Sequence, residues 1–110
     1  MNTPPLSKEM SPVIPQITVA KTWFVYVLHC ADGTLYTGIT TDTTRRVQEH
    51  NAGAPRGARY TRNRRPVTLA YVESAASRSA AARREWAIKQ LDHPRKRALC
   101  AAVAASSALE

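Results

Sequence analysis

Two tyrosines on neighbouring segments, followed by an arginine and a histidine one helical turn apart, are the residues of this chain best suited to joint chemistry. Tyr26 lies in an apolar run, and Tyr36 follows in a second run ten residues later. Arg46 and His50 are four residues apart, so they share one face of a helix. Two phenols, a guanidinium and an imidazole in this order are more than stability requires, and we treat them as a candidate site.

The segments that must position these side chains predict an α+β domain, a small three-stranded antiparallel sheet flanked by helices. The first strand is apolar almost throughout, which is typical of a central strand covered on both faces. Asp32-Gly33 predicts the hairpin that joins it to the second strand. Asp42 or Thr41 caps the next helix, and Gly53 ends it. The predicted order is β-β-α-β-α-α. The strands are expected over 23–29, 34–40 and 67–73. The helices are expected over 43–51, from Ser77 or Ser79 to 91, and over 94–104, with a single helical turn over 58–62 and a loop over 74–79.

The length of 110 residues fits one small domain with tails at both ends. Four prolines among small residues predict a disordered N-terminal tail over 1–20. The domain then spans 21–104, and the Ala/Ser-rich stretch 105–110 is expected to fray. The first twenty residues lack the charged and apolar regions of a signal peptide, so a cytoplasmic location is expected. Cys30 and Cys100 have no metal-binding spacing, and in a chain without a signal peptide we expect both thiols to be reduced. No run is apolar and long enough to cross a membrane.

The charge of the chain favours a phosphate-bearing partner. Sixteen basic residues stand against eight acidic ones, for a formal net charge of +8, and twelve of the basic residues are arginines. The stretch between His50 and Val72 contains no acidic residue. Nucleic acid is the natural polyanion for such a surface, because the planar guanidinium group binds phosphate in a bidentate manner. The predicted nucleic-acid-binding residues are Arg45, Arg56, Arg59, Arg62, Arg64 and Arg65.

These motifs together resemble the GIY-YIG nuclease superfamily, in its short stand-alone bacterial branch. The residues that carry the resemblance are Val25-Tyr26-Val27, Tyr36-Thr37-Gly38, Arg46 with His50, and a later helix with Glu85. The segments LYTGITTD, RRVQEH, ARYT and EWAIKQL add to it, and the resemblance covers roughly residues 22–100. Phe24 and Val25 stand where the first motif of the family has glycine and isoleucine.

The resemblance implies an endonuclease that hydrolyses DNA phosphodiester bonds with one divalent ion, Mg²⁺ or Mn²⁺. Tyr26 and Tyr36 match the tyrosines of the two motifs, and Arg46 matches the catalytic arginine. His50 matches the position one turn later, and Glu85 matches the acidic metal ligand. The closing glycine of the second motif, Gly38, is expected to be structural under any interpretation because it allows close approach within a strand.

Phosphodiester hydrolysis needs an activated water, neutralisation of the charge on phosphorus and help for the leaving oxygen. A tyrosine has a pKa near 10, so it needs a cationic setting to act as a base. Arg46 would brace the non-bridging oxygens, and Glu85 would hold a hard ion that keeps its waters. Which tyrosine takes the proton, and whether His50 assists as an acid or base, stays open at this stage.

Other interpretations are a non-catalytic nucleic-acid-binding module and a basic interaction protein, since both need only the arginines. Glu85 could equally form an ion pair with Arg84 or Lys89. Tyr60 is expected to pack against the sheet, whereas Trp86 could either pack or stack on bases. The partner is DNA, with RNA or a branched nucleic acid as alternatives, and the chain is expected to be a monomer or a weak dimer.

Overall fold

The computed structural model describes residues 21–108, so the tail predicted over 1–20 lies outside the described residues. The predicted α+β class is confirmed, and so is the order of the main elements, with the single predicted turn forming the short helix α2. The elements of the described chain are β1 (Trp23–His29), β2 (Leu35–Thr40), α1 (Thr43–Ala52), α2 (Arg59–Arg62), β3 (Thr68–Ala75), α3 (Arg78–Lys89) and α4 (His93–Ala108).

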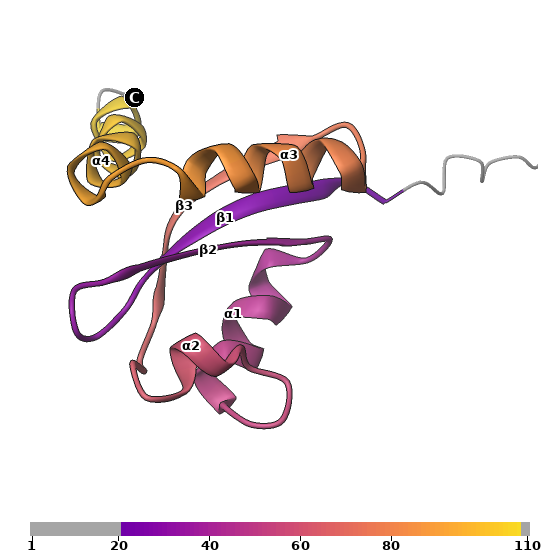
Figure 1. Ribbon diagram of the computed structural model, residues 1–110, viewed down its shortest axis with the longest axis vertical. Helices are drawn as coiled ribbons and strands as arrows, with labels where there is room; N and C mark the ends of the chain where they lie inside the picture. The colour runs from indigo at the N-terminus through magenta and orange to yellow at the C-terminus, as the bar shows by residue number, and fades with distance from the viewer. Residues whose placement is uncertain (1–20, 109–110) are drawn as a thin grey trace, which may run out of the picture.

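The three strands form one antiparallel sheet in the order β2-β1-β3, which makes β1 the central strand, as its apolar run predicts. Every residue from Val25 to Leu28 is buried, because both faces of the strand are covered. In Figure 1, α3 lies along one face of the sheet, and α1 and α2 lie on the other.

Alternating side chains of β1 divide the core into two parts. Val25 and Val27 pack against Ala81 and Ile88 of α3. Tyr26 points to the opposite face, where it joins a second cluster of buried residues on the side of α1. That cluster also contains Leu28, Cys30 and Val67, with Tyr36 and Val47 packed against it. The pleat of β1 therefore places Tyr26 on the face that α1 covers, and Tyr36 of β2, which pairs with Leu28, lies on the same face.

Local signals set the ends of α1. The Asp42 side chain accepts a hydrogen bond of 3.0 Å from the backbone N–H of Arg45, which resolves the choice between Asp42 and Thr41. Gly53 ends the helix with a φ of 85°, a value that favours glycine. Asn51 makes two hydrogen bonds to the backbone of Val67, accepting one from N–H at 2.7 Å and donating one to C=O at 3.0 Å. This clamp between α1 and β3 is not apparent from the sequence.

Three predicted boundaries were wrong by two residues or more. Helix α3 ends at Lys89 and not at 91. The third strand runs to Ala75, so Ser74 and Ala75 belong to β3 and not to the predicted loop, because they pair with Phe24 and Trp23 of the central strand. Helix α4 continues past residue 104 to Ala108. Its composition is rich in alanine, the residue with the highest helix propensity, and this favours continuation.

The pairing of β1 with β2 explains the glycine of the second strand. Tyr26 lies directly opposite Gly38 in the antiparallel register. A Cβ atom at Gly38 would lie 2.5 Å from the Tyr26 hydroxyl oxygen and 2.7 Å from Cζ. The Tyr26 ring therefore extends across β2 over the space that a side chain at position 38 would fill. Gly38 is structural, as predicted, and the group that approaches it closely is a phenol.

We predict that Gly38→Ala lowers the free energy of unfolding by about 1–3 kcal/mol, because the new methyl group overpacks a buried site. Urea denaturation of wild type and variant measures this change. In a Tyr26→Leu background the same substitution should cost much less, because the shorter side chain vacates the space over Gly38. Equal costs in the two backgrounds would contradict the proposed contact.

Candidate active site

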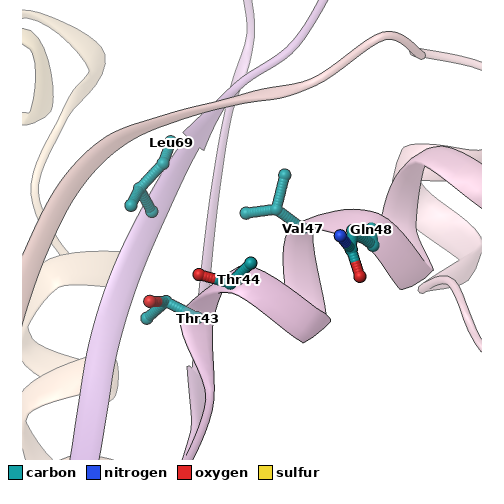
Figure 2. A pocket seen from close by; sticks show the side chains of 5 residues that line it. All are labelled: Thr43, Thr44, Val47, Gln48 and Leu69. Atoms are coloured by element: carbon teal, nitrogen blue, oxygen red, sulfur yellow. The ribbon is translucent and has the colours of Figure 1, made fainter.

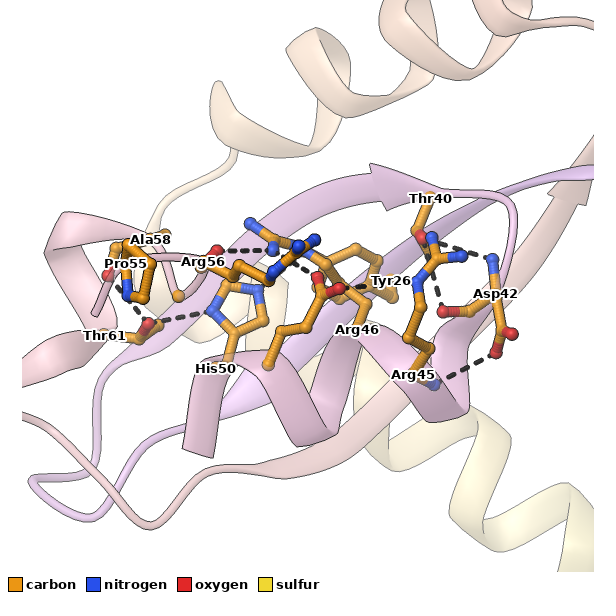
Figure 3. Close-up of polar contacts among 12 residues, drawn as sticks. Tyr26, Thr40, Asp42, Arg45, Arg46, His50, Pro55, Arg56, Ala58 and Thr61 are labelled. Carbon is orange, nitrogen blue, oxygen red and sulfur yellow. Dashed lines mark hydrogen bonds and ion pairs between the residues drawn. The ribbon is translucent and has the colours of Figure 1, made fainter. Parts of the chain in front are cut away.

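The two tyrosines and the histidine predicted from the sequence meet on the face of the sheet that α1 covers, and Arg46 lies beside them. The ring centroids of Tyr26 and Tyr36 are 6.4 Å apart, and those of Tyr36 and His50 are 5.2 Å apart. Figure 3 shows Arg46 and His50 projecting from α1 toward Tyr26. The strands supply the phenols and the helix supplies the cation and the imidazole, which is the arrangement expected from their order in the chain.

A chain of hydrogen bonds runs inward from Tyr26. Its hydroxyl is hydrogen-bonded to Nε2 of His50 at 2.9 Å, and Nδ1 of His50 is hydrogen-bonded to Oγ1 of Thr61 at 2.8 Å. The Thr61 hydroxyl donates to the backbone carbonyl of Ala58 at 3.0 Å. Tyr26, His50 and Thr61 are all buried. Sequence reasoning missed Thr61, although it lies in the ARYT segment, because nothing in the spacing links it to His50.

Burial keeps both partners of the first hydrogen bond neutral. Burial first, and the positive charge of Arg46 second, together lower the pKa of His50 to about 4. Burial raises the pKa of Tyr26 to about 12, against the opposing effect of a hydrogen bond and the charge from Arg46. At neutral pH, His50 is therefore an uncharged imidazole and Tyr26 is a protonated phenol.

Two groups hold Arg46 in place. Its Nη1 atom donates to Oε1 of Glu49 and to the backbone carbonyl of Arg56, each at 2.8 Å. The positive charge of Arg46 also opposes the rise in the pKa of Tyr26. The ion pair with Glu49 acts on the carboxylate as well. The same ion pair keeps the pKa of Glu49 below its ordinary value. The sequence shows Glu49 three residues after Arg46, a common helical pair, yet this residue was not singled out.

Glu85 lies on α3, the helix that covers the opposite face of the sheet. Its carboxylate forms an ion pair of 3.1 Å with Lys89, one of the partners that the sequence suggested as an alternative to metal binding. Its charge also contributes, as the smallest of the causes, to the raised pKa of Tyr26. Among the described residues no group of three or more His, Cys, Asp or Glu side chains could hold a metal ion.

Tyr60 packs on Tyr36, as the sequence suggested. The two rings are stacked with centroids 5.7 Å apart and an interplanar angle of 29°. The guanidinium carbon of Arg64 lies 4.0 Å from the Tyr60 ring centroid, and Nε of Arg64 lies 2.9 Å from Oδ2 of Asp32 in the hairpin turn. Trp86, for which stacking on bases and packing were both open, is 66% exposed and lies outside the core.

The predicted nucleic-acid-binding arginines fall into two groups. Arg62, Arg64 and Arg65 donate to carbonyl groups of their own segment, at distances of 2.8–3.4 Å. These bonds stiffen the turn-rich stretch between α1 and β3. The other three arginines present exposed guanidinium groups, and the one on α1 makes only a peripheral ion pair of 3.5 Å with Glu49. These three are Arg45, Arg56 and Arg59.

A shallow pocket of about 290 Å³ lies between α1 and β3, and none of the candidate residues lines it. Figure 2 shows its lining, in which Val47 and Leu69 are the large apolar residues. The tyrosines thus lie away from this hollow, in packed structure beside the arginine-rich segment. In the part of the chain that the structure describes, no helix is long and apolar enough to span a bilayer.

The buried imidazole predicts a pH dependence of stability. The pKa of His50 is about 4 in the fold and near 6.5 in an exposed histidine, so the unfolded chain binds the proton more tightly. Stabilisation by neutral His50 is complete above about pH 6.5 and is lost as the pH falls toward 4. From about pH 7 to about pH 4.5 we expect the free energy of unfolding to drop by roughly 2 kcal/mol through this group.

Chemical denaturation at a series of pH values measures this drop, and His50→Gln is the matched variant. Glutamine fills a similar space without titrating, so the loss in this window should shrink even if the variant is less stable throughout. Carboxylates such as Glu49 contribute below about pH 4.5 in both proteins. An equal slope in wild type and His50→Gln would contradict the prediction.

The comparisons with known proteins identify the family to which this chain belongs. Residues 22–98 match the family described as the GIY-YIG catalytic domain. A UPF0213 protein of Desulfotalea psychrophila is 64% identical over 77 residues, which are 70% of this chain and 69% of the relative. One of Halobacterium salinarum is 61% identical over 75 residues, 68% of this chain and 95% of the relative. The solution NMR structure of a protein from E. faecalis is 40% identical, with a TM-score of 0.51 over 82% of this chain and 90% of that one. This chain therefore belongs to the GIY-YIG family of nucleases, as its motifs predict.

Proposed function

We propose that this chain is an endonuclease that hydrolyses DNA phosphodiester bonds with one divalent ion. The observation that carries the proposal is the meeting of two phenols, a neutral imidazole and a partly exposed guanidinium, supplied by β1, β2 and α1. A protein that only bound nucleic acid would need the arginines but not the buried Tyr26–His50 pair. Membership of the GIY-YIG family supports the same chemistry.

Of the two tyrosines, Tyr36 is the better general base. Tyr26 is 2% exposed, and its hydroxyl is already hydrogen-bonded to His50, so an attacking water has little access to it. Tyr36 is only partly buried and rests against the His50 ring. It would take the proton of the attacking water as a general base. Tyr26 and His50 then have the task of holding the site together.

Arg46 is the group that would bind the phosphate. Its side chain is 23% exposed, so it can reach a substrate while Glu49 and the carbonyl of Arg56 hold it in place. A guanidinium group braces two phosphate oxygens at once and stabilises the charge that develops on phosphorus. Because its partners already orient it, little reorganisation is needed when the phosphate binds.

Glu85 would hold the divalent ion, Mg²⁺ or Mn²⁺. A single carboxylate fits such an ion, because Mg²⁺ keeps several waters and is often bound through one or two carboxylates and the phosphate of the substrate. Lys89, which now pairs with Glu85, would give up this contact. Once bound, the ion would neutralise charge on the phosphate oxygens and polarise a water.

DNA would approach over the segment between α1 and β3, with RNA or a branched nucleic acid as other substrates of the same chemistry. The exposed guanidinium groups of Arg45, Arg56 and Arg59 would contact its backbone, which gives binding that depends strongly on salt. The protein would act in the cytoplasm as a monomer or weak dimer. Discrimination between DNA sequences needs base contacts, which this backbone-directed surface does not itself supply.

We expect the wild type to nick plasmid or branched DNA in Mg²⁺ or Mn²⁺, and Arg46→Ala and Glu85→Ala to lower the cleavage rate constant by about 10²–10³-fold, the usual cost of removing a group that stabilises developing charge. Gel assays of nicking beside mobility-shift assays of binding measure both properties. Binding by Glu85→Ala should stay within a few fold of wild type. Lys89→Ala, which leaves the carboxylate in place, is the control and should still cut.

If all of these proteins bind DNA and none cuts with either metal, the domain is a nucleic-acid-binding module and the catalytic proposal fails. If binding also proves indifferent to Arg46→Ala and to the loop arginines, the chain is a basic interaction protein. The two outcomes are separated by the binding assay alone.

The division of the arginines makes a separate prediction. Arg59→Ala should weaken DNA binding and reduce the slope of log K against log[salt] by about 1, because one phosphate contact is lost, while stability stays within about 0.5 kcal/mol. Arg64→Ala should also lower stability, because Tyr60 loses its cation–π partner and Asp32 its ion pair. Arg95→Ala, a matched loss of charge on α4, should leave the slope nearly unchanged. Salt titrations and denaturation curves of the three variants check this.

A further inference from the structure

We propose that Thr61 is a positioning residue that fixes the tautomer of His50 and thereby the direction of the hydrogen bond between His50 and Tyr26, beside Arg46. The inference rests on the proposed function for its catalytic consequence, whereas its structural content stands on the buried contacts alone. Thr61 lies on α2, eleven residues from His50 in the chain, and its side chain is fully buried against the imidazole.

The Thr61 hydroxyl has one proton and two acceptors within reach, the carbonyl of Ala58 at 3.0 Å and Nδ1 of His50 at 2.8 Å. We assign the proton to Ala58, because the other arrangement puts the ring proton on Nε2 and turns the Tyr26 proton toward the positive charge of Arg46. Thr61 then accepts from His50, so Nδ1 of His50 carries the proton. A neutral imidazole has one N–H, so Nε2 must be the acceptor. The Tyr26 hydroxyl, 2.9 Å from Nε2, must then be the donor.

The direction of these hydrogen bonds matters at Tyr26, the residue of the row that lies nearest to Arg46. Once the Tyr26 proton points at His50, the lone pairs of the phenol oxygen are free to face the positive charge of Arg46, which acts on Tyr26. With the opposite tautomer, Nε2–H would donate to Tyr26 and the phenol proton would turn toward a cation. Thr61 thus acts on the Tyr26 hydroxyl, beside Arg46, through His50, in the row visible in Figure 3.

No other described side chain can replace Thr61 in this role. Both ring nitrogens of His50 are engaged, one by Tyr26 and one by Thr61, and the ring is fully buried, so solvent does not supply an alternative acceptor. The charged groups beside the ring are Arg46 and Glu49, and both belong to α1 and act on it from the same helix. The tautomer is therefore decided by α2.

The first test is a direct measurement on the wild type. Long-range ¹H–¹⁵N NMR spectra distinguish the two neutral tautomers, and the signals of His50 are identified by their absence in His50→Gln. We expect the Nδ1–H form at neutral pH. Observation of the Nε2–H form would overturn the proposal whether or not the protein cuts DNA.

The second test uses a pair of variants at position 61. Thr61→Val keeps the shape but removes the acceptor, and we expect the Nδ1–H form of His50 to lose its dominance. The cleavage rate constant should fall about 10–100-fold, because the Tyr26 hydroxyl beside Arg46 is no longer held in one orientation. DNA affinity should stay within about threefold. Thr61→Ser keeps the hydroxyl and should retain both the tautomer and the rate.

The outcomes separate the inference from the proposed function. If wild type shows the Nδ1–H form and no cleavage, the nuclease proposal fails and the structural role of Thr61 stands. If Thr61→Val cuts as fast as wild type, or if Thr61→Ser is as slow as Thr61→Val, the hydroxyl is not what matters and the inference is wrong. Should Thr61→Val not fold, the wild-type spectrum and Thr61→Ser still decide the question.

Discussion

The burial of one phenol determines how the rest of this domain is arranged. Tyr26 belongs to the central strand, and its side chain crosses the neighbouring strand over Gly38 to reach His50. A buried hydroxyl must have a partner, because leaving it unpaired costs about as much as a whole hydrogen bond contributes. The sheet register, the glycine and the placement of α1 therefore follow from one another. A change in any of them disturbs the hydrogen bond that the buried Tyr26 hydroxyl makes to His50.

The same constraint explains why α1 can be short and poor in apolar residues. Val47 is the only large apolar residue on this helix, so apolar burial alone anchors it weakly. Polar contacts make up for this, through His50 into the core and through Asn51 to the backbone of Val67. A helix held by directional bonds presents its other side chains in a defined orientation. Arg46, which lies on the same helix, is therefore held in a defined orientation.

The basic segment between α1 and β3 serves two purposes. Three of its five predicted binding arginines donate to nearby backbone carbonyl groups, and Arg64 also covers the Tyr60 ring. An irregular stretch with few apolar residues needs such bonds to keep one conformation. The remaining guanidinium groups stay exposed on the ordered backbone. A positive surface of fixed shape beside the tyrosines is suited to a polyanionic ligand.

The sequence by itself determined the class of the fold, the central place of the first strand, the end of α1 at Gly53 and the candidates Tyr26, Tyr36, Arg46 and His50. These follow from local patterns, because turn residues, caps and apolar runs act over a few neighbouring positions. Only the tertiary structure decided the extension of β3, which depends on pairing with another strand. It likewise decided which arginines donate to backbone carbonyl groups and that Thr61 contacts His50. Such contacts join residues whose spacing in the sequence matches no helix or strand period.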